Sequence, residues 1–77
     1  MMSMPIAQEK KITQATATVT SDALNMRSGP SAENSLIMTL RKGNVITIVE
    51  GTEGNNWVKV EYEGKTGYVN KDYINID

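Results

Sequence analysis

The feature that most constrains the fold is residues 57–69, which alternate in character on both sides of a Glu63-Gly64 pair. Alternation with a period of two around a short turn predicts a β-hairpin. A two-residue hairpin loop requires positive φ, which Gly64 adopts without steric cost. Closing the hairpin at this pair places Val60 opposite Gly67, and this fixes the register of both strands.

The two faces of this hairpin differ in composition. The first is apolar and is predicted to face the core; it consists of Val58, Val60, Tyr62, Gly67 and Val69. The second carries Trp57 and Tyr68 as diagonal neighbours, which lie close enough to touch. We therefore expect a ligand, if the chain binds one, at the face that carries these two rings.

The rest of the chain also indicates β structure. Short strands are predicted at residues 15–20, 24–27, 36–40, 45–49 and 74–76, with turn residues between them. The first of these alternates small residues with threonine, which favours a strand at an edge of the sheet. Residues 70–73 predict one helical turn, and no longer helical period occurs.

These strands predict an all-β fold: a small barrel or sandwich of five to seven short antiparallel strands. A chain of 77 residues has room for one small domain. We expect this domain at residues 15–77, and we expect residues 1–14 to be a disordered linker or leader. The predicted core is Leu24, Met26, Ile37, Leu40, Ile46, Ile48, Val58, Val60, Val69 and Ile74.

Composition excludes several classes of function. The chain has no Cys and no His, so it lacks disulfides, thiolate metal sites and the commonest general base. Its carboxylates fall mainly in loops or at solvent-facing strand positions, which leaves no catalytic constellation. We expect no enzymatic activity, no cofactor and no metal. A net charge of −1 gives no attraction to nucleic acid or to an anionic membrane.

Membrane and export signals are also lacking in the sequence. No apolar run is long enough to span a bilayer. Residues 1–14 lack the apolar core of a signal peptide, so we expect any export signal to lie outside this sequence.

Several motifs resemble those of the bacterial SH3 domain, in the same order along the chain. Residues 24–31 (LNMRSGPS) resemble the LNVRSGPS opening of that family, with Met26 at the usual Val position. Residues 57–60 (WVKV) resemble its W-Y-K-V, and residues 64–69 (GKTGYV) resemble its G-K-T-G-W-V, with Tyr68 replacing Trp. Smaller likenesses are the L-x-x-G step at residues 40–43 and the closing Tyr-Ile at residues 73–74. The resemblance covers about residues 18–76.

The resemblance implies an SH3-like barrel of the kind attached to enzymes that cut peptidoglycan, such as amidases and cell-wall peptidases. It also implies a function, which is targeting the attached enzyme to the cell wall. We expect a non-catalytic module of a larger secreted or envelope protein, monomeric in isolation, that binds peptidoglycan or its stem peptides. Two alternatives stay open at this point: a module that binds extended or Pro-rich peptides, and a structural spacer without a ligand.

Five residues are candidates for the ligand site: Trp57, Tyr68, Asn25, Arg27 and Tyr73. Trp57 and Tyr68 supply an aromatic platform opposite the apolar face. Arg27 is suited to binding a carboxylate through two parallel hydrogen bonds, or to bracing a turn. Residues 28–31 are read as structural, and so is Gly67, where a side chain would crowd the core.

Overall fold

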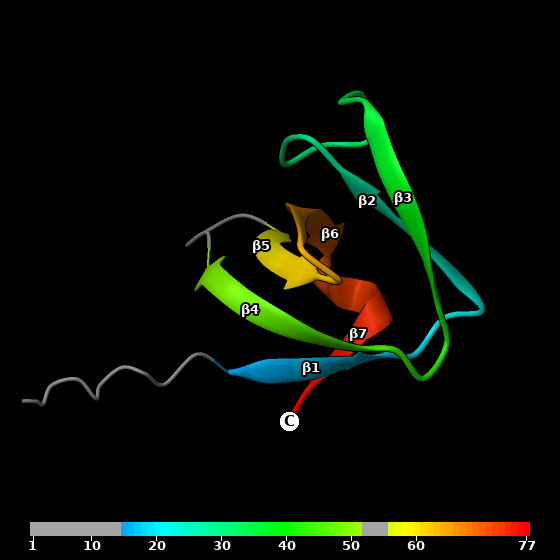
Figure 1. The fold of residues 1–77 in the computed structure, drawn as a ribbon. Helices are drawn as coiled ribbons and strands as arrows, with labels where there is room; N and C mark the ends of the chain where they lie inside the picture. Colours follow the sequence, from blue (N-terminus) through cyan, green and yellow to red (C-terminus); the bar gives the residue numbers. More distant parts are fainter. Residues whose placement is uncertain (1–14, 52–55) are drawn as a thin grey trace, which may run out of the picture.

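The computed structural model describes residues 15–51 and 56–77, and the linker predicted at residues 1–14 lies outside this part. Over these ranges the chain forms seven strands and one short 3-10 turn (Figure 1). They are β1 (Thr16–Val19), β2 (Ala23–Arg27), β3 (Leu36–Arg41), β4 (Val45–Gly51), β5 (Trp57–Tyr62), β6 (Lys65–Asn70), the turn η2 (Lys71–Tyr73) and β7 (Ile74–Ile76). The all-β prediction, including its single helical turn, is therefore confirmed.

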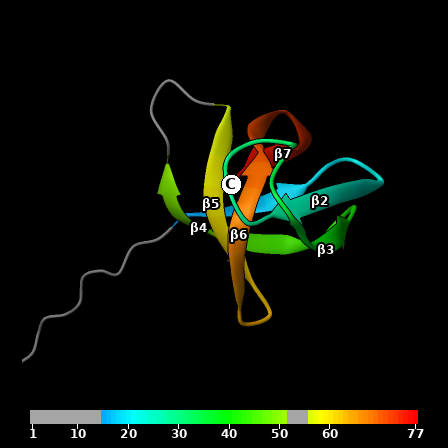
Figure 2. The same ribbon diagram turned by 90° about the horizontal axis from the view of Figure 1, so that it is seen from above.

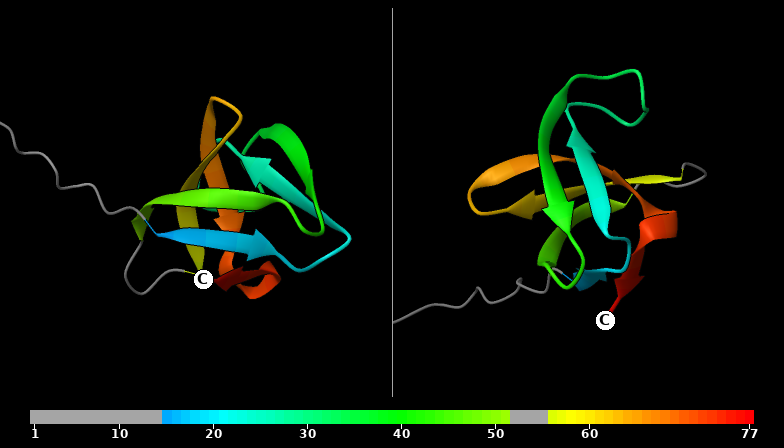
Figure 3. Two further views of the ribbon diagram at one scale, coloured as in Figure 1. Left: turned by 60° about the horizontal axis from the view of Figure 1, so that its bottom comes forward. Right: turned by 90° about the vertical axis from the view of Figure 1, so that its right-hand side faces the viewer.

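All seven strands belong to one sheet in the order β3-β2-β6-β5-β4-β1-β7, and every pairing is antiparallel. The sheet is strongly bent: the β5–β6 hairpin crosses the β2–β3 hairpin at a steep angle in Figure 2. In Figure 3, β4 and β1 run side by side across the β5–β6 hairpin. This arrangement is an SH3-like small barrel, as the sequence predicts.

Two backbone hydrogen bonds connect β1 with the turn that follows β3. The Val19 N–H donates to the Asn44 carbonyl at 2.9 Å, and the Gly43 N–H donates to the Val19 carbonyl at 2.9 Å. These bonds satisfy polar backbone groups at the end of β1 and in the turn between β3 and β4.

The position of β1 corrects one expectation. The strand was predicted at an edge, but it lies between β4 and β7, and it pairs with both. Its small residues permit this central position because Ala17 and Val19 point inward and are fully buried. Neither residue is in the core predicted from sequence.

Most of the predicted core residues are buried, and the others are partly buried. The buried hydrophobic residues are Ala17, Val19, Leu24, Met26, Leu40, Ile46, Val58, Val60 and Val69. Three predicted core residues, Ile37, Ile48 and Ile74, are only partly buried and pack against this cluster. Ile37 and Ile74 lie on the two edge strands of the sheet, β3 and β7, and Ile48 lies on β4 beside a register shift.

The β5–β6 hairpin has the predicted register throughout. Val60 lies opposite Gly67, and Tyr62 lies opposite Lys65 on either side of the turn. Gly64 has a φ of 80°, as expected, and Glu63 also has a positive φ, of 51°. Positive φ at both central residues is the geometry whose backbone twist matches that of the flanking strands. Glu63 thus adopts a left-handed conformation that residues other than Gly, Asn and Asp seldom occupy.

The two faces of β5 allow a direct test of the core assignment. We expect Val60→Ala to lower the free energy of unfolding by about 1–3 kcal/mol, because a fully buried side chain is lost and a cavity remains. Lys59→Ala, on the opposite face, should change it by less than about 0.5 kcal/mol. Urea denaturation of both variants measures the difference. Reversed costs would show that the strand is displaced by one residue, because such a shift exchanges the two faces.

Candidate binding pocket

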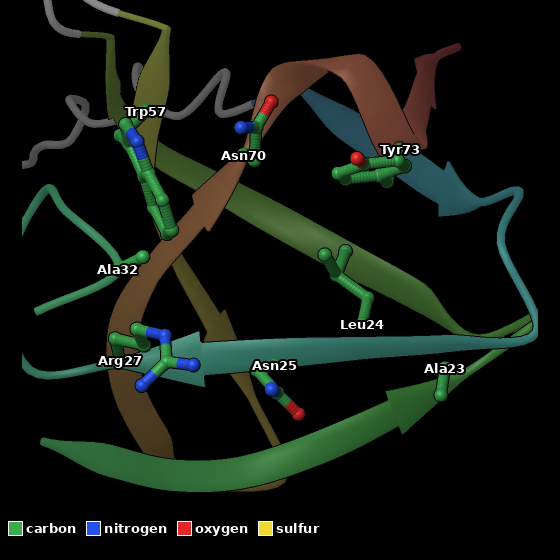
Figure 4. Close-up of a pocket in the computed structure, with 8 residues that line it drawn as sticks. All are labelled: Ala23, Leu24, Asn25, Arg27, Ala32, Trp57, Asn70 and Tyr73. Carbon is green, nitrogen blue, oxygen red and sulfur yellow. The ribbon is translucent and has the colours of Figure 1, made fainter.

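A pocket of about 370 Å³ opens where the β2, β5 and β6 strands approach η2 (Figure 4). Its lining comes from four secondary-structure elements and one loop. Strand β2 supplies Ala23, Leu24, Asn25 and Arg27, the following loop supplies Ala32, β5 begins with Trp57, β6 ends with Asn70, and η2 ends with Tyr73. The bend of the sheet brings these stretches together.

Two aromatic side chains form opposite parts of the pocket. Trp57 is half-buried at the start of β5, and Tyr73 is 48% exposed at the end of η2. Leu24, which is almost fully buried, lies between them and gives the pocket an apolar base, as Figure 4 shows. An apolar base with aromatic walls and a few polar groups is the usual composition of a ligand pocket.

Four of the five predicted site residues line this pocket: Trp57, Tyr73, Asn25 and Arg27. Tyr68 does not. It lies on the outer face of the hairpin as predicted, half-buried, with Lys59 opposite it on β5 and Arg27 opposite it on β2. The pocket therefore includes one of the two rings on this face, Trp57, and not the other.

Arg27 has a structural contact within the domain. Its Nη1 donates a hydrogen bond to the Asn34 carbonyl at 3.0 Å, so the guanidinium braces the loop that carries Ala32. Of the two roles considered for this arginine, bracing a turn is thus present in the structure. A guanidinium has five N–H donors, and one such bond leaves others to face the pocket.

Asn25 is also engaged at its side-chain oxygen. Its Oδ1 accepts a hydrogen bond from the Thr39 hydroxyl on the neighbouring strand at 2.9 Å. In Figure 4 its amide points away from Leu24, on the other side of β2. Asn25 therefore belongs to the rim of the pocket.

The loop between β2 and β3 has a tightly determined shape. The Ser31 hydroxyl donates to Asn34 Oδ1 at 3.2 Å and accepts from the Glu33 N–H at 3.1 Å. Gly29 is buried against Asn34, and a Cβ built on this glycine would lie 2.6 Å from Asn34 Oδ1. The structural interpretation of this turn cluster is consistent with these contacts, and they hold Ala32 at the pocket.

Comparison with known proteins places this fold and its motifs in a family. A family model described as bacterial SH3 domain matches residues 22–75. The chain belongs to the bacterial SH3 domain family. The match includes β2 through most of β7, and with them every residue that lines the pocket.

Individual relatives of this bacterial SH3 domain are longer proteins. The chain is 46% identical over 70 residues to a probable endopeptidase p60 of Listeria seeligeri, which covers 90% of this chain and 12% of that protein. It is 39% identical over 57 residues to the cell wall-binding protein YwsB of Bacillus subtilis, covering 73% of this chain and 32% of the relative. A putative N-acetylmuramoyl-L-alanine amidase, YrvJ of Bacillus subtilis, is 32% identical over 59 residues, which cover 77% of this chain and 11% of that protein.

Sequence reasoning missed part of the pocket of this bacterial SH3 domain. Ala32 falls between two predicted strands and was not a candidate, and Asn70 was interpreted only as the start of a helical turn. The signal for Asn70 is its position: it caps η2, accepting the Asp72 N–H at 2.8 Å, and it lies opposite Trp57 in the hairpin. Because Asn70 pairs with Trp57 and is followed directly by the predicted turn, it lies at the same end of the barrel as that ring.

The chemistry of the lining suits binding. The pocket presents one cation, Arg27, together with amide groups and aromatic rings. Within residues 15–51 and 56–77, no group of three or more His, Cys, Asp or Glu side chains is arranged to hold a metal ion. In the same part of the chain, no helix is both long and apolar enough to cross a membrane. The arrangement can hold a ligand through ring contacts and hydrogen bonds.

Proposed function

We propose that this bacterial SH3 domain is a non-catalytic module that binds peptidoglycan on behalf of a longer protein. The observation that carries the proposal is the pocket that joins Trp57, Tyr73 and Arg27, in a domain whose relatives include a protein named as cell wall-binding. Relatives named as an endopeptidase and an amidase favour a peptidoglycan hydrolase as the parent protein. The module then comprises residues 15–77 and acts outside the cell or in its envelope.

The ligand we propose is the stem peptide together with the adjoining sugar. Stem peptides offer amides and carboxylates, which suit the Asn70 amide and the donors of Arg27 that face the pocket. Trp57 and Tyr73 supply apolar surface for small side chains and for the faces of sugar rings. Such contacts need only modest affinity, because tethering raises the effective concentration of the attached enzyme at its substrate.

Co-sedimentation with purified sacculi tests this function. We expect residues 15–77 to sediment with intact sacculi and to remain in solution without them. Glycan strands stripped of peptides by an amidase form the matched comparison, and binding to them should be much weaker if the stem peptide supplies the main contacts. Absence of binding to any sacculus, together with binding to a Pro-rich peptide, would replace this proposal with a peptide-interaction function. Binding to neither would leave a spacer.

A further inference from the structure

Asn56 makes three hydrogen bonds to one short stretch of the chain. Its side-chain Nδ2 donates to Asn70 Oδ1 at 2.9 Å and to Asp72 Oδ2 at 3.0 Å. Its backbone carbonyl accepts from the Lys71 N–H at 2.8 Å. Asn56 is exposed and does not line the pocket, so these bonds are its evident role in the fold.

These bonds connect the two aromatic walls of the pocket. Asn56 directly precedes Trp57, and Asp72 directly precedes Tyr73. Asn70 lies between the two rings in Figure 4, and its Oδ1 also accepts the Asp72 N–H at 2.8 Å as the cap of η2. The Asn56 side chain therefore links the residue before one ring to the residue before the other.

Each aromatic wall of the pocket lies at the end of a secondary-structure element. Trp57 is the first residue of β5, and Tyr73 is the last residue of a turn of three residues with no buried member. Strand ends and single turns are among the least stable parts of a domain. Backbone hydrogen bonds hold the two ends of η2: the Lys71 N–H donates to the Asn56 carbonyl at 2.8 Å, and the Thr20 N–H donates to the Tyr73 carbonyl at 2.9 Å. The Asn56 side chain adds a direct link from the Trp57 end of the hairpin to Asp72 in the middle of this turn.

We infer that Asn56 is a positioning residue of the pocket, which fixes the spacing of Trp57 and Tyr73 before a ligand arrives. The inference rests on the proposed function, since it assigns Asn56 a role in that same site. Asn56 acts through the rings and has no ligand contact of its own. Holding the rings in place in the free protein reduces the ordering that binding must otherwise impose, and this raises affinity without a new contact.

The first test is Asn56→Ala, with Thr18→Val as its matched control. Thr18 also donates its side-chain proton to a carboxylate, that of Asp77, and β1 contributes no residue to the pocket. We expect Asn56→Ala to raise the sacculus concentration needed for half-maximal binding by about tenfold, a change of about 1.4 kcal/mol, and Thr18→Val to leave it unchanged. Both variants should remain folded by circular dichroism.

A readout in the free protein separates positioning from a general loss of stability. The chain has one tryptophan, so its fluorescence reports on the Trp57 wall alone. We expect Asn56→Ala to lower the fluorescence anisotropy of Trp57 in the absence of sacculi, because the ring gains freedom of motion. Thr18→Val should leave the Trp57 anisotropy unchanged, even if it lowers the midpoint of thermal unfolding as much as Asn56→Ala does.

Exchanging donor and acceptor provides a rescue. Asn56→Asp preserves the shape of the side chain, but it removes both donated bonds and sets a carboxylate against that of Asp72, so binding should fall. In the double variant Asn56→Asp/Asp72→Asn, the amide introduced at position 72 donates to the carboxylate introduced at position 56. We expect this double variant to bind sacculi more tightly than Asn56→Asp alone.

The outcomes distinguish this inference from the function on which it rests. If the unaltered domain does not bind sacculi, the proposed function is wrong. If it binds, and both Asn56 variants bind equally well with unchanged Trp57 anisotropy, the positioning role is wrong while the function stands. A double variant that binds no better than Asn56→Asp would likewise overturn the link between positions 56 and 72.

Discussion

Gly67→Ala is expected to lower the free energy of unfolding by about 3 kcal/mol, at the upper end of the usual cost of overpacking a core. A Cβ at this buried position would lie 2.6 Å from Met26 Cγ, 2.8 Å from the Arg27 carbonyl oxygen and 2.9 Å from Ile37 Cδ1. The two side chains can rotate to some extent. The Arg27 carbonyl cannot, because it belongs to the stretch where β2 pairs with β6.

Urea denaturation measures this cost, with Thr66→Ala as the comparison. Thr66 is the exposed neighbour of Gly67 on the same strand, and its replacement should change stability by less than about 0.5 kcal/mol. Combining Gly67→Ala with Met26→Ala tests the cause. Because the shortened side chain at position 26 removes one of the clashes, the double variant should lose less stability than the sum of the losses in the two single variants. Full additivity, or a cost at position 67 as small as that of Thr66→Ala, would contradict the steric account.

The inward direction of Gly67 was predictable because it follows from local pattern, whereas the atoms of β2 and β3 that crowd this position do not. Alternation fixes which residues of a hairpin point inward, and Gly64 fixes where the chain turns, so Gly67 falls opposite Val60 in both the prediction and the structure. The same reasoning fails for β1. Its partners β4 and β7 are set by closure of the barrel across the length of the chain, and a run of Ala and Thr carries little information about such distant pairing.

The set of residues that line the pocket was likewise only partly predictable from local pattern. Alternation places Trp57 and Tyr68 on one face, but it does not describe how the sheet bends beneath them. Strand β2 pairs with β6 at Arg27 and Tyr68, while Trp57, at the end of the hairpin, faces η2. The pocket therefore takes in Tyr73 and Asn70 and leaves Tyr68 outside. The Asn56 link was also beyond prediction, because its partners are known only once η2 is placed.

The largest functional effect is expected from Trp57→Ala. Removing this ring should raise the sacculus concentration for half-maximal binding at least tenfold, because one entire wall of the pocket is lost. Trp57 is half-buried and has further interactions within the fold, so some loss of stability is expected as well. Binding is therefore measured well below the unfolding midpoint of the variant, and Trp57→Phe, which keeps an aromatic wall, should retain most of the affinity.

Tyr68→Ala is the matched comparison, since it removes an aromatic ring from the same outer face of the same hairpin. If the pocket alone binds the ligand, this variant should sediment with sacculi nearly as well as the unaltered domain. A loss equal to that of Trp57→Ala would extend the site across the outer face to Tyr68, as alternation in the sequence predicts. Binding that survives Trp57→Ala undiminished would place the site away from the pocket, because no ligand held between Trp57 and Tyr73 could be indifferent to the loss of one of them.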